Sequence, residues 1–309
     1  MSELTIVTAF FDIGRANWKG FERNSNKYVE YFKFWARIKN KLVVYTDEAT
    51  AQQVWKIREG YGLKNQTQVI IVNEIDQLDP EVASQLNQVV ANEILLKFRE
   101  RPENPESHSA KYNYVTYLKP YFIADAIKKQ RIDGMIAWVD FGYNHNGEAY
   151  PNTKEFDFLW EYDFSKHIHI FTTQDIDDMP IFDIIHKMKV YISGGIIVAP
   201  ASLWAELAVL FRQSILHLTH CGLADADQTL LVMAYREKPS LFSVHAVMDW
   251  FMVLKEFGAT HLSIKHAKPL YKTYKREARK HWQERRYQEA IKWYLKYGKE
   301  KIWRCPRQG

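Results

Sequence analysis

The sequence predicts an α/β fold in which helices cover a largely parallel sheet. Short apolar segments rich in β-branched residues alternate with longer segments of helical spacing over most of the 309 residues. This alternation is typical of parallel sheets, whose strands are joined by helical crossovers. Hydrophobic residues make up 47% of the chain, against only 13 Gly and 10 Pro. These figures exclude a disordered protein, and the length suits one large domain or two small ones.

The first ninety residues contain three predicted strands with helices between them. The strands are expected at 4–11, 41–46 and 68–73. Aromatic residues at helical spacing predict a helix over 26–39. Asp47 and the Asp79-Pro80 pair mark the starts of two further helices, because Asp is a frequent cap and Pro is tolerated in the first turn.

The remainder of the chain continues the same alternation. A helix over 111–129 is expected to be interrupted or entered near Pro120. Further helices are expected at 202–218 and 224–237, and a pair of helices from Tyr271 with a break near Arg285. Strands follow at 134–143, 167–173 and 191–200; the second alternates as a half-exposed strand does, and a glycine pair breaks the third.

Several classes of protein are excluded by absent sequence features. No apolar run approaches the roughly 20 residues of a membrane span, and the first residues do not read as a signal peptide. The two cysteines, Cys221 and Cys305, are too few for a disulfide framework, which favours a cytoplasmic protein. The glycine-rich fingerprints of dinucleotide-binding and P-loop proteins and the hydrolase G-x-S-x-G turn are missing.

Positive charge is concentrated at the end of the chain. Residues 267–309 hold 14 Lys and Arg against 4 Glu, a charge of +10 within a total of +5, so the preceding residues carry −5. We therefore expect a main domain over 1–265 and a basic, aromatic helical tail over 266–309. Such a tail is compatible with a solvated helical hairpin, an anionic membrane surface or nucleic acid. Nucleic acid is the least favoured of the three.

Polar residues follow the predicted strands, where an open α/β sheet binds its ligands. They include Thr8, Ala9 and Arg15 after the first strand, and Tyr45 and Thr46 after the second. Loops after strands are polar in any case, so each is a weak signal alone.

The strongest single candidate is Asp140, which ends the apolar run IAWVD. A carboxylate there is costly unless it is paired or binds a ligand, although such an Asp is often only a turn or helix cap. His167 and His169 lack a third neighbouring ligand, which argues against a zinc site.

Two further groups lie in the second half of the chain. Gly194 and Gly195 indicate either close approach of another molecule to the backbone or a bulge. Asp225, Asp227 and Gln228 open a helix, and the second carboxylate exceeds what capping requires. A carboxylate in this place is suited to orienting or deprotonating a hydroxyl group.

These motifs have an order that resembles a known group of enzymes. VDFGY, YISGGIIVAP and ADADQTLL follow one another as the motifs of GT-A nucleotide-sugar glycosyltransferases do. VTAFFDIGR, KLVVYT, YNYVTYLKPYFIADAI and WVDFGY more specifically resemble the bacterial HtrL/YibB family, over residues 4–250. The resemblance implies a GT-A-like Rossmann-type mixed sheet flanked by helices. It also implies transfer of a hexose from a nucleotide sugar, UDP-linked in our interpretation, to a surface polysaccharide or lipopolysaccharide acceptor.

The resemblance also implies roles for individual residues. Asp140 corresponds to the first acid of the D-x-D motif, which holds Mn²⁺ or Mg²⁺ or the ribose, whereas Gly142 replaces the second acid. His245 or His266 is expected to complete the metal site, and Asp227 to be the catalytic carboxylate. The expected donor-binding residues are Thr8, Ala9, Arg15, Tyr45, Thr46, Lys111, Lys119, Gly194, Gly195 and Gln228.

The expected partners are therefore a nucleotide-sugar donor and a glycan or lipid-linked glycan acceptor. The basic tail would hold the protein on the inner face of the cytoplasmic membrane. Gly142 supports an alternative of another class, a non-catalytic protein that binds a nucleotide or glycan on a degenerate transferase fold.

Overall fold

The computed structural model describes residues 2–147, 149–264, 274–275, 278–279, 281–282 and 285–304. The chain divides into two compact units. The first comprises residues 1–147 and 152–262, and the second comprises 148–151 and 263–309. No helix within the described ranges combines the length and apolarity needed to cross a membrane.

The first unit is built on a mixed sheet of eight strands in the order β3-β2-β1-β4-β7-β6-β8, with β5 paired to β1. Strands β1 to β4 run parallel to one another, whereas β7 is antiparallel to both of its neighbours, β4 and β6. The predicted α/β class is confirmed, and the sheet is less uniformly parallel than the alternation alone indicates. The strands are β1 (Ser2–Phe10), β2 (Leu42–Thr46), β3 (Thr67–Ile71), β4 (Met135–Val139), β5 (Glu161–Tyr162), β6 (Ile168–Thr172), β7 (Ile196–Pro200) and β8 (Phe242–Ala246).

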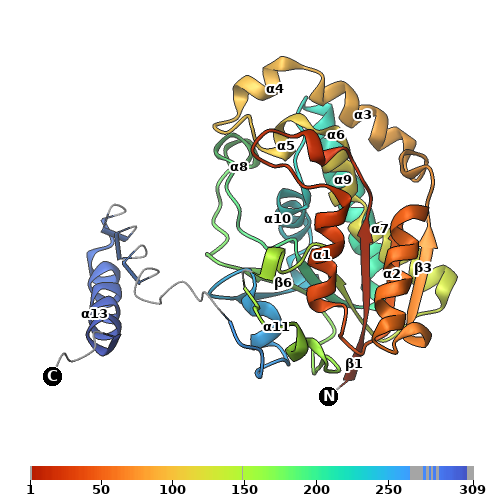
Figure 1. The fold of residues 1–309 in the computed structure, drawn as a ribbon. Coiled ribbons are helices and arrows are strands. Elements are labelled where there is room, and N and C mark those ends of the chain that lie inside the picture. Colours follow the sequence, from red (N-terminus) through yellow and green to blue (C-terminus); the bar gives the residue numbers. More distant parts are fainter. Residues whose placement is uncertain are drawn as a thin grey trace. The chain divides into compact units, whose positions relative to one another are not determined.

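Helices cover both faces of this sheet. Helices α1 and α2 lie in front of it in Figure 1, and α7 and α9 lie behind it. Asn24, Asp47 and Asp79 cap α1, α2 and α3 with their side chains, as predicted for the two Asp residues. The main helices of the unit are α1 (Ser25–Trp35), α2 (Glu48–Gly60), α3 (Pro80–Val90), α6 (Ala110–Tyr117), α7 (Lys119–Gln130), α9 (Ala201–His220) and α10 (Asp227–Glu237).

Shorter elements fill the connections. They are the helices α4 (Glu93–Phe98), α5 (Pro105–His108), α8 (Ile181–Lys187) and α11 (Met252–Glu256) and, among the described residues, six 3₁₀ turns, of which Arg15–Asn17 and His145–Gly147 border the site. The sequence patterns did not predict α4, α5, α8, α11, β5 or β8. In the second unit α13 (Tyr287–Arg304) begins where the predicted break ends, and the preceding tail helix lies largely outside the described residues.

The structure decides two local expectations, one about a strand and one about a helix. Strand β6 lies between β7 and β8, and all five of its residues are buried, so the half-exposed strand predicted from its alternation is wrong. The helix predicted over 111–129 is confirmed as two consecutive helices, α6 and α7, which meet at Leu118 just before Pro120. This junction places Lys119 at the first position of α7.

Candidate functional site

A cavity opens at the carboxyl ends of β1 and β4. From β1 the chain proceeds through β2 to β3 on one side, whereas β4 lies on the other side of β1. Ligands of open α/β sheets bind at such a reversal of strand order. The cavity is lined by Ala9, Phe10, Phe11, Asp12, Ile13, Arg15, Arg23, Tyr28, Tyr112, Val115, Thr116, Lys119, Trp138, Asp140, Phe141, Gly142, His145, Gly194, Gly195, Asp227 and Gln228.

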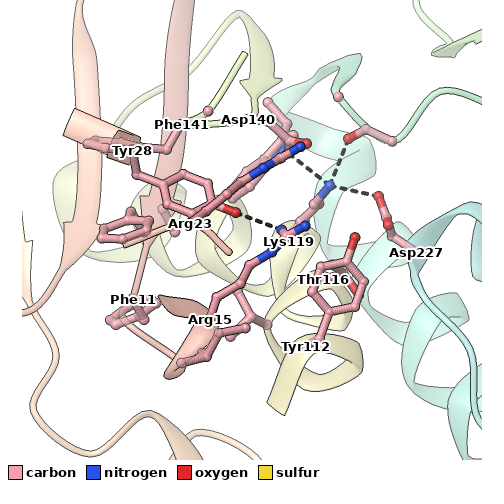
Figure 2. Close-up of a pocket in the computed structure, with 18 of the residues that line it drawn as sticks. Phe11, Arg15, Arg23, Tyr28, Tyr112, Thr116, Lys119, Asp140, Phe141 and Asp227 are labelled. Carbon is pink, nitrogen blue, oxygen red and sulfur yellow. Dashed lines mark hydrogen bonds and ion pairs between the residues drawn. The ribbon is translucent and has the colours of Figure 1, made fainter. Parts of the chain in front are cut away.

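Lys119 is the centre of the polar side of this cavity. Its ammonium donates to Asp227 Oδ2 at 2.7 Å and to the backbone oxygen of Gly194 at 2.8 Å. Asp140 Oδ1 lies 2.8 Å from the same nitrogen. Figure 2 shows the ammonium between the two carboxylates. An ammonium has three protons, so these three acceptors satisfy it completely.

Burial and charge determine the protonation of this cluster. Lys119 and Asp227 are 5% and 4% exposed, whereas the side chain of Asp140 is 40% exposed. Burial disfavours the charged form of Lys119, but Asp140 and Asp227 outweigh it, and the net effect raises its pKa. Burial raises the pKa of Asp227; the Lys119 ammonium opposes this effect and Asp140 adds to it. Lys119 therefore remains an ammonium ion.

Asp140 and Asp227 are each positioned by local structure. The indole nitrogen of Trp138 donates to Asp140 Oδ1 at 2.7 Å, and this ring comes from the buried strand β4. Asp227 begins α10 but does not cap it. Asp225 has a separate set of partners, because it accepts from the backbone nitrogen of Ala226 and from the Thr229 hydroxyl. The second carboxylate of ADADQ is thus free to face the cavity.

Gly194 is required for this arrangement. A Cβ atom there would lie 1.8 Å from Asp227 Oδ2, whereas one at Gly195 would meet nothing closer than 3.6 Å. The close approach inferred from the glycine pair is therefore made by Asp227 of the same chain. The pair lies just before β7, which starts at Ile196.

Arginines and aromatic rings form the other side of the cavity. Arg15 donates to the Tyr28 hydroxyl at 2.7 Å and to the backbone oxygen of Phe21 at 3.3 Å. Its guanidinium lies 5.7 Å from the ring centres of both Trp18 and Tyr112. Figure 2 shows Arg23 on the same side as Tyr28.

Eight of the residues expected at the site line one cavity. They are Ala9, Arg15, Lys119, Asp140, Gly194, Gly195, Asp227 and Gln228. Four further lining residues were not predicted from the sequence: Arg23, Tyr28, Tyr112 and Trp138. Their positions in or near predicted strands and helices could have indicated that they lie close to the site.

The other expected site residues lie elsewhere. Thr8 is buried within β1, the Tyr45 hydroxyl bonds to Asp125, and the Thr46 hydroxyl bonds to the backbone of Phe10. Lys111 lines a separate hollow beside Trp18. His266 lies outside the described residues.

His245 is engaged with another histidine. His245 Nε2 lies 2.8 Å from His169 Nδ1, and the two rings stack across the neighbouring strands β8 and β6. A metal ion between two imidazole nitrogens needs about 2 Å on each side, so this distance leaves no space for one.

The residues present do not fit a divalent metal ion at Asp140. The Lys119 ammonium occupies the point where Asp140 Oδ1, Asp227 Oδ2 and the Gly194 carbonyl oxygen converge. A Cβ atom at Gly142 would lie 3.0 Å from the Tyr28 ring, so a second acid there would require the ring to move. Among the described residues, no group of three or more His, Cys, Asp or Glu side chains is arranged to hold a metal.

Comparison with known proteins identifies the family. The family described as "Bacterial protein of unknown function (HtrL_YibB)" matches residues 2–259. Protein HtrL of Escherichia coli strain K12 is 30% identical over 281 residues, which cover 85% of this chain and 95% of that protein. The chain belongs to the HtrL/YibB family. The resemblance inferred from the sequence motifs is thereby confirmed, and the cavity lies within the part of the chain that matches the HtrL/YibB family.

Two solved structures share a more distant likeness with this HtrL/YibB member. Mouse xyloside xylosyltransferase 1 in its apo form is 12% identical, with a TM-score of 0.41, over 82% of this chain and 93% of that chain. The PaToxG glycosyltransferase is 11% identical, with a TM-score of 0.34, over 77% and 70% respectively. Both TM-scores are below 0.5, so the function proposed for this family member has to come from its own site.

Proposed function

We propose that this protein is a nucleotide-sugar-dependent hexosyltransferase that uses a UDP-linked donor and a surface polysaccharide or lipopolysaccharide acceptor. The observation that carries the proposal is the cavity where the strand order reverses between β1 and β4. It joins arginines suited to an anionic diphosphate with a buried carboxylate suited to a hydroxyl group.

The two sides of the cavity suit the two parts of a nucleotide sugar. Arg15 and Arg23 follow β1 and would bind the diphosphate, since guanidinium groups match phosphate oxygens in charge and geometry. Tyr28 and Tyr112 lie beside them and offer ring faces for the base or the sugar. Lys119, Asp140 and Asp227 would lie at the reacting end.

The reaction follows from these roles. The bond between the anomeric carbon and the diphosphate oxygen breaks, and a bond from that carbon to the acceptor oxygen forms. Asp227 accepts the proton of the acceptor hydroxyl, which balances the charge on the new glycosidic oxygen. The nearby cations stabilise the negative charge that develops on the diphosphate.

A lipid-linked acceptor would be met at the membrane surface. We place a transferase domain over residues 1–265 and a basic membrane-contacting tail over 266–309, with no nucleic acid as partner. In the tail, α13 exposes Tyr287, Ile291 and Leu295 at helical spacing, together with Lys292 and Lys296. Exposed apolar and basic residues on one helix favour the inner face of the cytoplasmic membrane.

Liposome binding tests the tail. Replacing its Lys and Arg residues by Gln should abolish sedimentation with phosphatidylserine vesicles and leave the weak sedimentation with phosphatidylcholine vesicles unchanged. Undiminished binding of the neutralised variant to anionic vesicles would refute the role of the tail.

The catalytic proposal is tested by separating binding from turnover. UDP binding is measured by calorimetry, and UDP release is measured with a panel of UDP-sugars and bacterial envelope glycolipids. Arg15→Gln should weaken UDP binding about tenfold or more, since a charged hydrogen bond is lost. Asp227→Asn should keep UDP binding within a few-fold and abolish release.

The outcomes distinguish the alternatives. UDP binding without release from any sugar or acceptor in the wild type would indicate a non-catalytic binding protein. Absence of binding by every nucleoside diphosphate tested would refute the transferase proposal.

A further inference from the structure

Three oxygen atoms converge on the Lys119 ammonium from separate parts of the chain. They belong to Asp140 after β4, to Gly194 before β7 and to Asp227 at the start of α10, at 2.7–2.8 Å. Two carboxylate oxygens and a backbone carbonyl oxygen are the ligand types that bind hard divalent cations. In this chain the atom at their centre is the nitrogen of a side chain.

The surrounding structure is built to keep the lysine there. Lys119 begins α7 directly after the break at Leu118, and it is 5% exposed. Gly194 has no side chain to displace Asp227. The Trp138 indole donates to the same Asp140 oxygen as the ammonium does, and its ring centre lies 5.7 Å from the Lys119 nitrogen. These contacts hold both carboxylates toward Lys119.

The cavity also contains positively charged side chains that can bind a diphosphate without a metal ion. Arg15 is oriented by the Tyr28 hydroxyl, and Arg23 lines the same cavity. The Tyr28 ring in turn lies against Gly142, where a second acidic ligand would otherwise stand. Tyr28 therefore disfavours a second acidic ligand through its ring and orients an arginine through its hydroxyl.

We propose that Lys119 is a built-in replacement for the divalent cation of this site. Its ammonium neutralises Asp140 and Asp227, so a nucleoside diphosphate binds to Arg15 and Arg23 without a metal ion. This inference rests on the proposed function for its nucleotide part, whereas its metal part concerns the free protein. Lys119 is a positioning residue for the two carboxylates and also a fixed positive charge beside the leaving diphosphate.

The first experiment measures UDP affinity by calorimetry in EDTA and in MnCl₂. The wild type should bind with the same Kd, within about twofold, in both buffers. Lys119→Ala should lose about tenfold or more in EDTA, because the unpaired carboxylates repel the diphosphate, and regain part of the loss in MnCl₂. Lys128→Gln is the matched control, since it removes an exposed charge from the same helix, and it should behave as the wild type.

The second experiment measures Mn²⁺ binding without nucleotide, by thermal shift and electron paramagnetic resonance. The wild type should give no Asp140-dependent Mn²⁺ binding. Lys119→Ala should acquire Mn²⁺ binding, which the double variant with Asp140→Asn should lose. If Lys119→Ala does not fold, Lys119→Met removes the charge without opening a hole, and the wild-type comparison between buffers decides.

The two experiments separate the possible failures. A wild-type affinity for UDP that rises about tenfold or more with Mn²⁺ would overturn the role of Lys119 and leave the transferase proposal standing. Absence of nucleoside diphosphate binding would refute the proposed function. The Mn²⁺ titration would still test whether Lys119 keeps a metal ion from Asp140. Asp140-dependent Mn²⁺ binding by the wild type would overturn the inference in either case.

Discussion

Substituting Gly194 by Ala should disrupt the Lys119 cluster from the backbone side. The new Cβ atom would lie 1.8 Å from Asp227 Oδ2 and 2.7 Å from its Cγ, so the carboxylate has to move away from Lys119. The loss of a charged hydrogen bond costs about 1.5–3 kcal/mol, and breaking a buried ion pair costs about 3–5. We expect a loss of about 3 kcal/mol in the free energy of unfolding. For a unit of this size that lowers Tm by about 6–12 °C.

Two comparisons identify the cause. Gly195→Ala meets its nearest atom at 3.6 Å, an ordinary contact, and should change Tm by about 2 °C or less. In an Asp227→Ala background the clashing atoms are absent, so the added Gly194→Ala should cost less than about 1 kcal/mol. Thermal and urea unfolding of the wild type, Gly194→Ala, Asp227→Ala and the double variant measure the coupling between the two positions. Equal costs of Gly194→Ala in both backgrounds would refute the steric argument.

Three further predictions concern other parts of the fold. Burial lowers the pKa of His169 and of His245 below 6.5, so the folded state binds fewer protons than the unfolded state and stability is lost as pH falls below 6.5. His245→Phe should reduce this loss, measured as the fall in Tm between pH 7 and 5. An unchanged dependence of Tm on pH would contradict the role given to His245. Arg58 is 1% exposed and donates to three backbone carbonyls. Arg58→Met should therefore lower the free energy of unfolding in urea by about 3 kcal/mol or more. Lys56→Met, on the exposed side of the same helix, should lower it by about 0.5 kcal/mol or less. Gly142→Asp should lower Tm by several degrees without creating a Mn²⁺-induced thermal shift, because its Cβ atom would lie 3.0 Å from an aromatic ring; a metal-dependent rise in Tm would show that the ring yields.

The sequence was sufficient to locate the residues that end or begin regular elements. Asp140 follows an apolar strand and Asp227 exceeds the needs of a helix cap, and both features are local. Choosing between Lys111 and Lys119 was not possible, because both belong to one helical pattern. The break at Leu118 separates them, and only the folded chain reveals which one reaches Asp227, 108 residues away.

Features created by tertiary packing were beyond the sequence patterns. Alternation in β6 indicated one solvated face, yet both faces are covered by packed side chains. Ile168 and Ile170 belong to the main core, and on the other face His169 and Phe171 pack against Phe164 and Phe257. His245 carries no local sign of its partner, since the stacking with His169 depends on the pairing of β6 with β8. Arg23 and Tyr28 enter the cavity because the segment after β1 folds back over it.

The antiparallel course of β7 has a consequence for how this family can diversify. Because β6 runs toward the cavity edge of the sheet and β7 starts from that edge, the connecting segment 173–195 begins at the same edge as the site and ends at Gly194 and Gly195, which line it. Ile184, Ile185 and Ile192 of this segment are buried in the core, and Gly194 is fixed by Asp227. Only its more exposed first part, residues 173–180, can change in length and composition without altering the register of any strand, as is usual for surface connections. Insertions and deletions among relatives should therefore gather in this first part. They would change which acceptors reach the site while the Lys119 cluster stays constant.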